Sequence, residues 1–299
     1  MASTSLTLIP LPGDFGVQVG GLDVAEPVAP DIMAALADAF FEYRFLLLRG
    51  QHPSPDAFAA FANQWGNPRV GDAPSPLDIP GIPGMGMVGN IGDLLSRDEY
   101  RNGAAFWHTD CAAEPDADAA TMLYCLQAPA AGGETVIADM QAAYDALDKA
   151  TKSEIEPLMA RHCYSGTRDI IGGVEDWEYP VHKMSDETIA NLPPPVTRPL
   201  ARPHSVTGRR ALYSPAGSII AVDGMDPAAA HTLVRRLKLH AIEDAFCYAH
   251  QHRPGDILIW DNSATMHSAR PVDPPKSETD NRLHYRMVLK GLPFNLKPL

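Results

Sequence analysis

The clearest pattern of hydrophobic and polar positions lies in residues 54–66, which read SPDAFAAFANQWG. Phe58, Phe61 and Trp65 recur at spacings of three and four, which places them on one face of an α-helix. Ser54 can cap this helix, and the Pro-Asp pair after it suits a first turn, because an acidic side chain favours the positive end of the helix dipole. The pattern predicts an amphipathic helix with one buried face.

Other segments carry the spacing of helices or of buried strands. Helices are expected over residues 32–43, 140–147 and 227–246, and strands over residues 45–48, 122–126, 134–138, 256–260 and 283–289. A Thr-Gly turn at 207–208 between two strand-like runs predicts a hairpin. Residues 72–103 are dense in proline and glycine, and residues 166–195 are irregular, so both are expected to be long loops.

The arrangement of these elements predicts the fold class. Many short strands with a few helices, no internal repeat and no linker-like change in composition favour one β-rich domain over residues 1–299, a barrel or a sandwich. With 299 residues, 45% of them hydrophobic, the chain is long enough for a large core. No apolar run reaches the ~18 residues of a transmembrane helix, and the N-terminus lacks a basic signal-peptide region. We therefore expect a cytoplasmic protein without a membrane partner.

Charge and cysteine content narrow the function classes. The net charge of −13 repels phosphate backbones, so nucleic acid is not an expected partner. Two adjacent arginine pairs, at 209–210 and 235–236, are expected to be solvated surface. The four cysteines are far apart and form no CxxC motif, which favours reduced thiols over a zinc ribbon or a disulfide framework.

One short motif, WHTD at residues 107–110, raises the question of metal binding. In a strand, residues two apart face the same side, so His108 and Asp110 could offer a nitrogen and an oxygen to one ion. With a second histidine from elsewhere they would form the two-histidine, one-carboxylate set typical of non-heme Fe(II). The chain has 11 histidines and about one acidic residue in eight, so chance alone yields roughly one such motif. The motif by itself therefore does not decide whether His108 and Asp110 bind a metal ion.

Segments elsewhere in the chain provide further evidence about the function of this motif. The chain continues with GGETVIADMQAAYDAL, HSVTGRRALY, PGDILIWDNSATMH and the terminal NRLHYRMVLKG. Together with FLLLRGQHPSPDAFAAFANQWG and WHTD, in this order and spacing, these segments resemble the TauD/TfdA family of Fe(II)- and 2-oxoglutarate-dependent dioxygenases, the taurine and 2,4-D dioxygenase-like enzymes. The resemblance covers nearly the whole length.

The resemblance implies a set of site residues, matched one by one. The metal ligands, and with them the catalytic centre, would be His108, Asp110 and His267. Thr135, which lies 27 residues after His108, would bind a 2-oxoglutarate carboxylate, and Arg282 would clamp its distal carboxylate. Arg286 would meet the anionic end of the substrate.

The resemblance also implies fold and chemistry. The fold would be a double-stranded β-helix (a cupin-like jelly roll), mainly β with flanking helices. Fe(II), 2-oxoglutarate and O2 would serve to hydroxylate a small or medium organic anion, with release of succinate and CO2. The anion could be an aryloxyalkanoate, an alkyl sulfate or sulfonate, a phosphonate or a natural-product acid, and a bond from carbon to a heteroatom could break. A homo-oligomer, dimer or tetramer, stays open.

Several details depart from the family pattern or remain open. Taurine-specific members carry polar residues just before the motif, whereas here the stretch is Gly-Ala-Ala-Phe at 103–106, which favours a larger or more apolar anion. His250 and His252 are expected to be solvated, His284 to face inward beside the two arginines, and Trp177 and Tyr179 to be lid candidates.

Other readings of the same residues remain. Arg282 could instead pair with a buried acid, and the partner of Arg286 could be a protein group. At the level of function, the alternatives are a metal-dependent jelly-roll enzyme that does not use 2-oxoglutarate, a cofactor-independent oxygenase, and a non-catalytic binding protein on the same scaffold.

Overall fold

The structure is a computed structural model that describes residues 6–13, 15–71, 75–116, 119–164, 187 and 190–291. Its helices are α1 (Pro30–Tyr43), α2 (Pro55–Trp65), α3 (Gly92–Leu95), α4 (Asp98–Arg101), α5 (Met140–Ala146), α6 (Lys149–Ile155) and α8 (Pro227–Ala241), with 3-10 turns at Asp244–Phe246 and Glu278–Asp280. Its strands are β1 (Thr7–Pro10), β2 (Val17–Gly20), β3 (Phe45–Leu48), β4 (Asn67–Pro68), β5 (Met85–Gly89), β6 (Ala119–Gln127), β7 (Thr135–Asp139), β8 (Met159–His162), β9 (Val196–Pro199), β10 (Ala201–Pro203), β11 (Arg210–Leu212), β12 (Ile219–Val222), β13 (Cys247–His250), β14 (Ile257–Asp261), β15 (Thr265–Ala269) and β16 (Leu283–Lys290).

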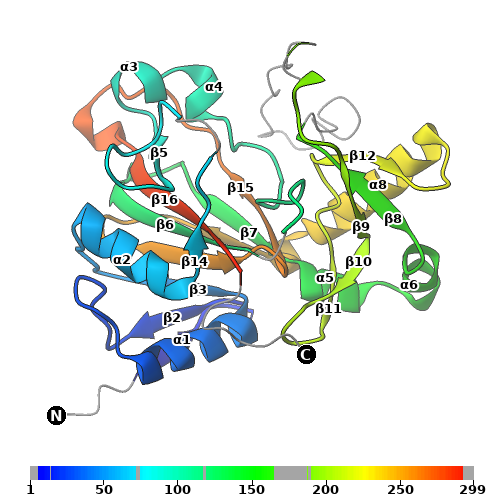
Figure 1. Cartoon of the computed structure of the whole chain (residues 1–299), viewed down its shortest axis with the longest axis horizontal. Coiled ribbons are helices and arrows are strands. Elements are labelled where there is room, and N and C mark those ends of the chain that lie inside the picture. Colours follow the sequence, from blue (N-terminus) through cyan, green and yellow to red (C-terminus); the bar gives the residue numbers. More distant parts are fainter. Residues whose placement is uncertain are drawn as a thin grey trace.

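Two sheets form the centre of the molecule (Figure 1). The large sheet has the order β1-β2-β3-β14-β6-β16-β4, with β5 added to β16, and the small sheet has the order β13-β7-β15. The pairs are antiparallel except for β2 with β3. Because neighbours in both sheets come from distant parts of the chain, residues of the middle and of the C-terminus lie side by side.

A layer of apolar side chains joins the two sheets. This core contains Phe45 and Leu47 of β3, Leu123 of β6, Ile137 of β7 and Leu258 of β14. The side chains of one face of each strand meet between the sheets, as expected for two packed antiparallel sheets. The mainly β jelly-roll prediction is confirmed.

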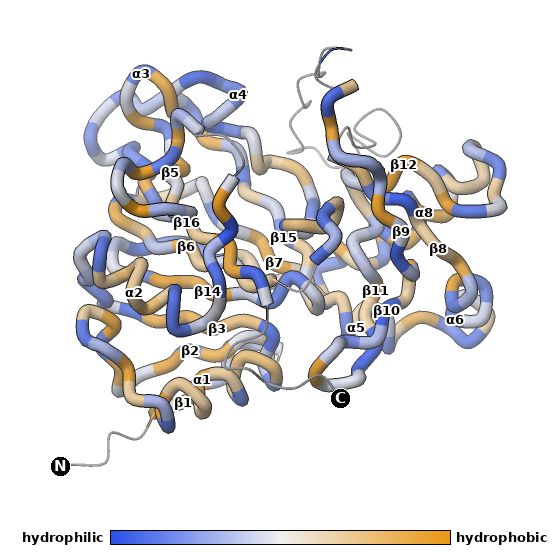
Figure 2. The backbone as a smooth tube through the Cα atoms, in the orientation of Figure 1, coloured by the Kyte–Doolittle hydropathy of each residue, from blue (hydrophilic) through white to orange (hydrophobic). Residues whose placement is uncertain are grey.

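Helices α1 and α2 cover the outer face of the large sheet (Figure 1). The predicted helix cap is present, since the Ser54 side chain accepts a hydrogen bond from the backbone N–H of Ala57 at 3.2 Å. Phe58, Phe61 and Trp65 are buried against the sheet as the spacing predicts. In Figure 2, hydrophobic positions follow the strands of the sheet beneath these helices.

A second apolar cluster lies beyond the small sheet. Here α5 and α8 pack with the three-stranded sheet β12-β8-β9 and the hairpin β10-β11. The hairpin turns where the sequence predicts, and Gly208 adopts φ +68°, a left-handed conformation that suits glycine. Helix α8 ends at Ala241, five residues before its predicted end, and a separate 3-10 turn follows.

One element prediction is wrong. The Pro/Gly-rich segment 72–103 is not a plain loop, because it contains β5 and the short helices α3 and α4. Strand β5 pairs with β16, and a Cβ on Gly89 would stand 2.2 Å from the carbonyl oxygen of Arg282. Glycine therefore permits a close strand contact here. Of the predicted loop 166–195, all but residues 187 and 190–195 lies outside the described residues, as do Trp177 and Tyr179. No described helix is both long enough and apolar enough to cross a membrane.

Candidate functional site

Two histidines from distant segments of the chain lie side by side. His108 precedes β6 and His267 lies on β15, and their backbones exchange two hydrogen bonds of 2.9 and 2.8 Å. Their rings are 4.2 Å apart between centroids. The Phe106 ring lies against His108 and the Trp260 ring against His267. The backbone bridge and these aromatic neighbours hold the two imidazoles together.

Asp110 completes this cluster. Its two carboxylate oxygens lie 3.7 Å from Nε2 of His108 and 3.7 Å from Nε2 of His267. Thr121 donates a hydrogen bond of 2.6 Å to Oδ2, and Arg286 donates one of 2.6 Å to Oδ1. Burial alone would raise the pKa of Asp110, but the charge of Arg286, the two imidazoles and Thr121 outweigh it and hold the pKa well below its ordinary value. The side chain is therefore a carboxylate.

The chemistry of this donor set fits a divalent metal ion. One ligand atom from each of His108, Asp110 and His267 lies within 4.8 Å of the others. The Nδ1 atom of His108 lies 2.8 Å from the carbonyl oxygen of Phe106, which can only accept, so Nδ1 carries the proton and Nε2 keeps its lone pair toward Asp110. Burial and the neighbouring His108 hold the pKa of His267 well below its ordinary value, so this ring is neutral as well. Two neutral imidazoles and one carboxylate are the ligands that Fe(II) takes in such sites.

Arg282 directly precedes β16 and is buried at 5% exposure. Its backbone is held by Asn90, whose side chain accepts from Arg282 N at 2.7 Å and whose N–H donates to Arg282 O at 3.0 Å. The glycine pair before β7 lies over its side chain: a Cβ on Gly133 would stand 3.1 Å from Cδ of Arg282. No described residue forms an ion pair with this guanidinium, so the alternative of a buried acid partner does not apply to the described part of the chain.

Thr135 begins β7 and is 3% exposed. Its hydroxyl oxygen lies 2.8 Å from Nε2 of His252, a contact that the sequence did not suggest. The prediction that His250 and His252 are solvated is wrong: they are 1% and 4% exposed. His250 ends β13 and binds the Asp256 carboxylate at 2.9 Å, while His252 packs against His284 with ring centroids 4.5 Å apart. The strand-like spacing of the two histidines was visible, but their burial depends on β6 and β16.

Arg286 lies four residues after Arg282 on β16 and differs from it in exposure and partner. Its side chain is 36% exposed and contacts Asp110, so part of its interaction is with a protein group. It also lines a cavity of about 560 Å³ whose wall comes from residues within 69–71 and 75–88 and from Val288. Apolar lining residues include Leu77, Ile79 and Val88. One guanidinium thus stands between the carboxylate of the cluster and a largely apolar cavity.

Two tryptophans and a cysteine near the metal-ligand residues are buried, and the paired arginines lie at the surface. Trp107 and Trp260 are buried at 1% and 2%, and Cys111 is a buried thiol whose pKa burial raises to about 12. Among the paired arginines, Arg210 and Arg236 form ion pairs at the surface, with Glu156 and Glu154.

A buried acidic network that the sequence did not indicate lies beyond Cys111. Glu114 binds Lys290 at 2.7 Å and also contacts Arg69 and Tyr164. Glu114 thus pairs with Arg69 in the wall of the cavity. Arg286, the other arginine in that wall, instead contacts Asp110 of the metal-ligand cluster.

Comparison with known proteins agrees with this geometry. The family model described as "Taurine catabolism dioxygenase TauD, TfdA family" matches residues 7–288. The alpha-ketoglutarate-dependent 2,4-dichlorophenoxyacetate dioxygenase of Cupriavidus pinatubonensis is 31% identical over 278 residues, 90% of this chain and 93% of that protein. The (S)-phenoxypropionate/alpha-ketoglutarate-dioxygenase of Sphingobium herbicidovorans is 29% identical over 97% of each chain. The crystal structure of AAD-2 in complex with Mn(II) and N-oxalylglycine superimposes with a TM-score of 0.78 and 28% identity, covering 96% of this chain and 97% of that one.

Proposed function

Because the chain belongs to the TauD/TfdA family of Fe(II)- and 2-oxoglutarate-dependent dioxygenases, we propose that it hydroxylates an amphiphilic organic anion through a metal centre made by His108, Asp110 and His267. The single observation that carries this proposal is the convergence of these three side chains, with ligand atoms within 4.8 Å of one another. The buried Arg282, which has no acid partner among the described residues, supports the cosubstrate assignment. When bound, Fe(II) and 2-oxoglutarate would supply electrons that activate O2, the oxidant, and 2-oxoglutarate would be converted to succinate and CO2.

The chain's own residues prepare the metal ligands. The Phe106 carbonyl fixes the proton of His108 on Nδ1, so Nε2 carries the lone pair that metal coordination requires. Thr121 holds one oxygen of Asp110, and Asn262 in turn donates to Thr121 at 2.9 Å and accepts from the backbone N–H of Asp110. These bonds orient the ligands before any ion arrives, which is the function of groups around a metal site.

The cosubstrate and substrate are assigned to the two arginines of β16. Arg282 presents a planar guanidinium that can bind both oxygens of the distal carboxylate of 2-oxoglutarate, with Thr135 as a further hydrogen-bonding group. Arg286 is assigned to the anionic end of the substrate, and the cavity beside it to the apolar body. Such a cavity favours an aryloxyalkanoate-like acid over taurine, in line with the names of the two relatives above.

The test is a screen of organic anions for substrate-dependent succinate release with Fe(II), ascorbate and O2, starting with aryloxyalkanoates. His108→Ala, Asp110→Ala and His267→Ala should each abolish turnover, because a two-ligand site cannot hold the ion in place. His231→Ala, on the distant helix α8, is the matched control and should keep turnover. Succinate release that survives the ligand substitutions would refute the metal assignment.

The same screen distinguishes the alternatives. An Fe(II)-loaded protein without affinity for 2-oxoglutarate would favour a metal-dependent enzyme of another class, and a protein that does not bind Fe(II) would favour a binding function. A single domain over residues 1–299, a cytoplasmic location and assembly into a dimer or tetramer remain predictions, and light scattering on the purified protein checks the last of them.

A further inference from the structure

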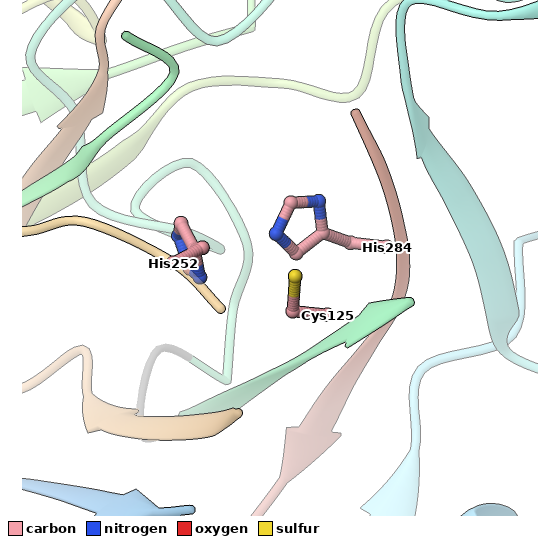
Figure 3. A group of neighbouring side chains, drawn as sticks. All are labelled: Cys125, His252 and His284. Atoms are coloured by element: carbon pink, nitrogen blue, oxygen red, sulfur yellow. The ribbon is translucent and has the colours of Figure 1, made fainter. Parts of the chain in front are cut away.

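A second cluster of chemically active side chains lies beside Arg282, away from the metal ligands. Cys125 of β6, His284 of β16 and His252 after β13 point toward one another (Figure 3). One ligand atom from each lies within 4.8 Å of the others. Cys125 and His284 are fully buried and His252 is 4% exposed. The jelly roll therefore places two imidazoles and a thiol in a dry interior.

The charges around this cluster disfavour a metal ion. The guanidinium of Arg282 acts on all three side chains, and no carboxylate among the described residues pairs with it. Asp256, the acid nearest Cys125, is already bound by Arg49 at 3.0 Å and by His250. Burial raises the pKa of the Cys125 thiol to about 12, so it is neutral. A divalent cation here would face an unpaired positive charge, whereas an anion would be attracted.

Several buried nitrogen atoms of this region lack a partner. They are both ring nitrogens of His284, Nδ1 of His252 and Nε of Arg282. Burial, together with the nearby charge of Arg282, holds the pKa values of both imidazoles well below the ordinary range. Each ring is therefore neutral and carries one N–H donor. The unpaired donors are thus the Nε–H of Arg282 and one ring N–H of His284. Because buried donors are normally hydrogen-bonded, they indicate a ligand that accepts hydrogen bonds.

The contact between His252 and Thr135 decides where the hydroxyl proton of Thr135 points. If Nε2 of His252 accepts, the Thr135 proton is used within the protein. If Nε2–H donates to the hydroxyl oxygen, the Thr135 proton is free for an outside acceptor. Thr135 has no other side-chain hydrogen bond in the described part of the chain, so the tautomer of His252 controls this donor.

We propose that His252 and His284 complete the recognition of the distal carboxylate of the oxo-acid cosubstrate: His252 is a positioning residue that turns the Thr135 hydroxyl proton toward the carboxylate, and His284 donates a ring N–H to it. The inference rests on the function proposed above. His284 is placed for this because it lies on β16 two residues after Arg282, whose charge acts on the His284 ring. The His284 ring also lies edge-to-face with His252. The guanidinium of Arg282, the Thr135 hydroxyl and the His284 imidazole then form a subsite made of donors, with His252 behind Thr135.

Calorimetric titration of the Mn(II)-loaded protein with N-oxalylglycine, a non-reactive analogue of 2-oxoglutarate, tests the proposal without turnover. His252→Phe, Thr135→Val and His284→Leu should each weaken binding by about tenfold, the loss of one hydrogen bond. Because His252 acts through Thr135, the double variant His252→Phe/Thr135→Val should bind no more weakly than Thr135→Val alone. His252→Gln, which keeps an N–H donor, should restore most of the affinity.

Oxalate is the matched control ligand, since it can bind the metal but has no distal carboxylate. The wild type and all variants should bind oxalate equally, which also shows that the variants fold and load Mn(II). Nitrogen NMR of the His252 ring should report the proton on Nε2. Unchanged N-oxalylglycine affinity in His284→Leu would overturn the assignment of His284. Unchanged affinity in His252→Phe, additive effects of His252→Phe and Thr135→Val, or a proton on Nδ1 of His252 would overturn the assignment of His252.

Two further outcomes have separate meanings. A wild-type protein that binds Mn(II) and oxalate but not N-oxalylglycine would refute the proposed function itself, and the inference with it. A second equivalent of Zn(II) that binds the wild type and is lost in Cys125→Ala would show a metal site at this cluster and would overturn the carboxylate assignment.

Discussion

Arg282 carries a buried charge that the protein itself does not neutralise, and replacing it should therefore separate stability from function. Burial lowers its pKa from the ordinary 12.5 to about 10, with Cys125 opposing slightly. Since one pKa unit corresponds to 1.36 kcal/mol, keeping this charge in the folded protein costs on the order of 3 kcal/mol. Methionine has a similar length and no charge. We expect Arg282→Met to raise the free energy of unfolding of the metal-free protein by about 1–3 kcal/mol and to abolish N-oxalylglycine binding.

Urea denaturation at pH 7 measures the stability, and calorimetry of the Mn(II) protein measures the binding. Two controls separate charge from shape. Arg282→Lys keeps a cation in the pocket and should give no comparable gain. Arg49→Met removes an arginine that pairs with buried Asp256, and it should destabilise the protein by about 1–3 kcal/mol because a carboxylate loses its partner. A lower urea midpoint for Arg282→Met, or analogue binding that survives it, would refute the reasoning.

Three further predictions follow from the same geometry. Arg286→Ala should raise KM for an anionic substrate by about tenfold to a hundredfold, because a charge-assisted hydrogen bond is lost. KM for 2-oxoglutarate should rise much less, and equal increases would assign Arg286 to the cosubstrate. Gly133→Ala places a Cβ 3.1 Å from Cδ of Arg282 and should raise KM for 2-oxoglutarate by about tenfold, whereas Gly132→Ala, with nothing within 4 Å, controls for backbone strain. In the metal-free protein, burial lowers the pKa of four histidines: His162, to about 3, and His252, His267 and His284. Below pH ~6.5 these four side chains bind protons in the unfolded chain but not in the folded protein, so stability should fall by about 5 kcal/mol per pH unit. Urea midpoints of the metal-free protein at pH 7.5 and 5.5 check this, and His162→Gln should remove about a quarter of the slope.

Local patterns predicted those elements whose formation depends on neighbours in sequence. The helix after Ser54 and the strand Phe45–Leu48 occur where the spacing and the capping residue place them. Strand β5 was missed, because glycines and prolines disfavour an isolated strand. Its pairing partner, β16, lies almost 200 residues away, and only that contact explains why Gly86 and Gly89 are tolerated in a strand.

The residues of the candidate site likewise fall into those predicted from the sequence and those recognised only in the structure. The order and spacing of motifs in the sequence named His108, Asp110, Thr135, His267 and Arg282, and the fold brings them to one interior. His284 was expected to face inward and is buried, whereas the burial of His252 was not predicted, because a histidine is solvated or buried according to which strands pack over it. The contact of Arg286 with Asp110 likewise joins residues 176 positions apart.

By itself, the sequence determined the residue types available for chemistry, the local elements and the family, since periodicity, caps and motif spacing are properties of neighbouring positions along the chain. The tertiary structure alone decided which side chains are desolvated, which charges lack a partner and which tautomers their neighbours impose. Burial and electrostatics act through space, and the antiparallel pairing of strands from the middle and the end of the chain creates the dry interior in which they act.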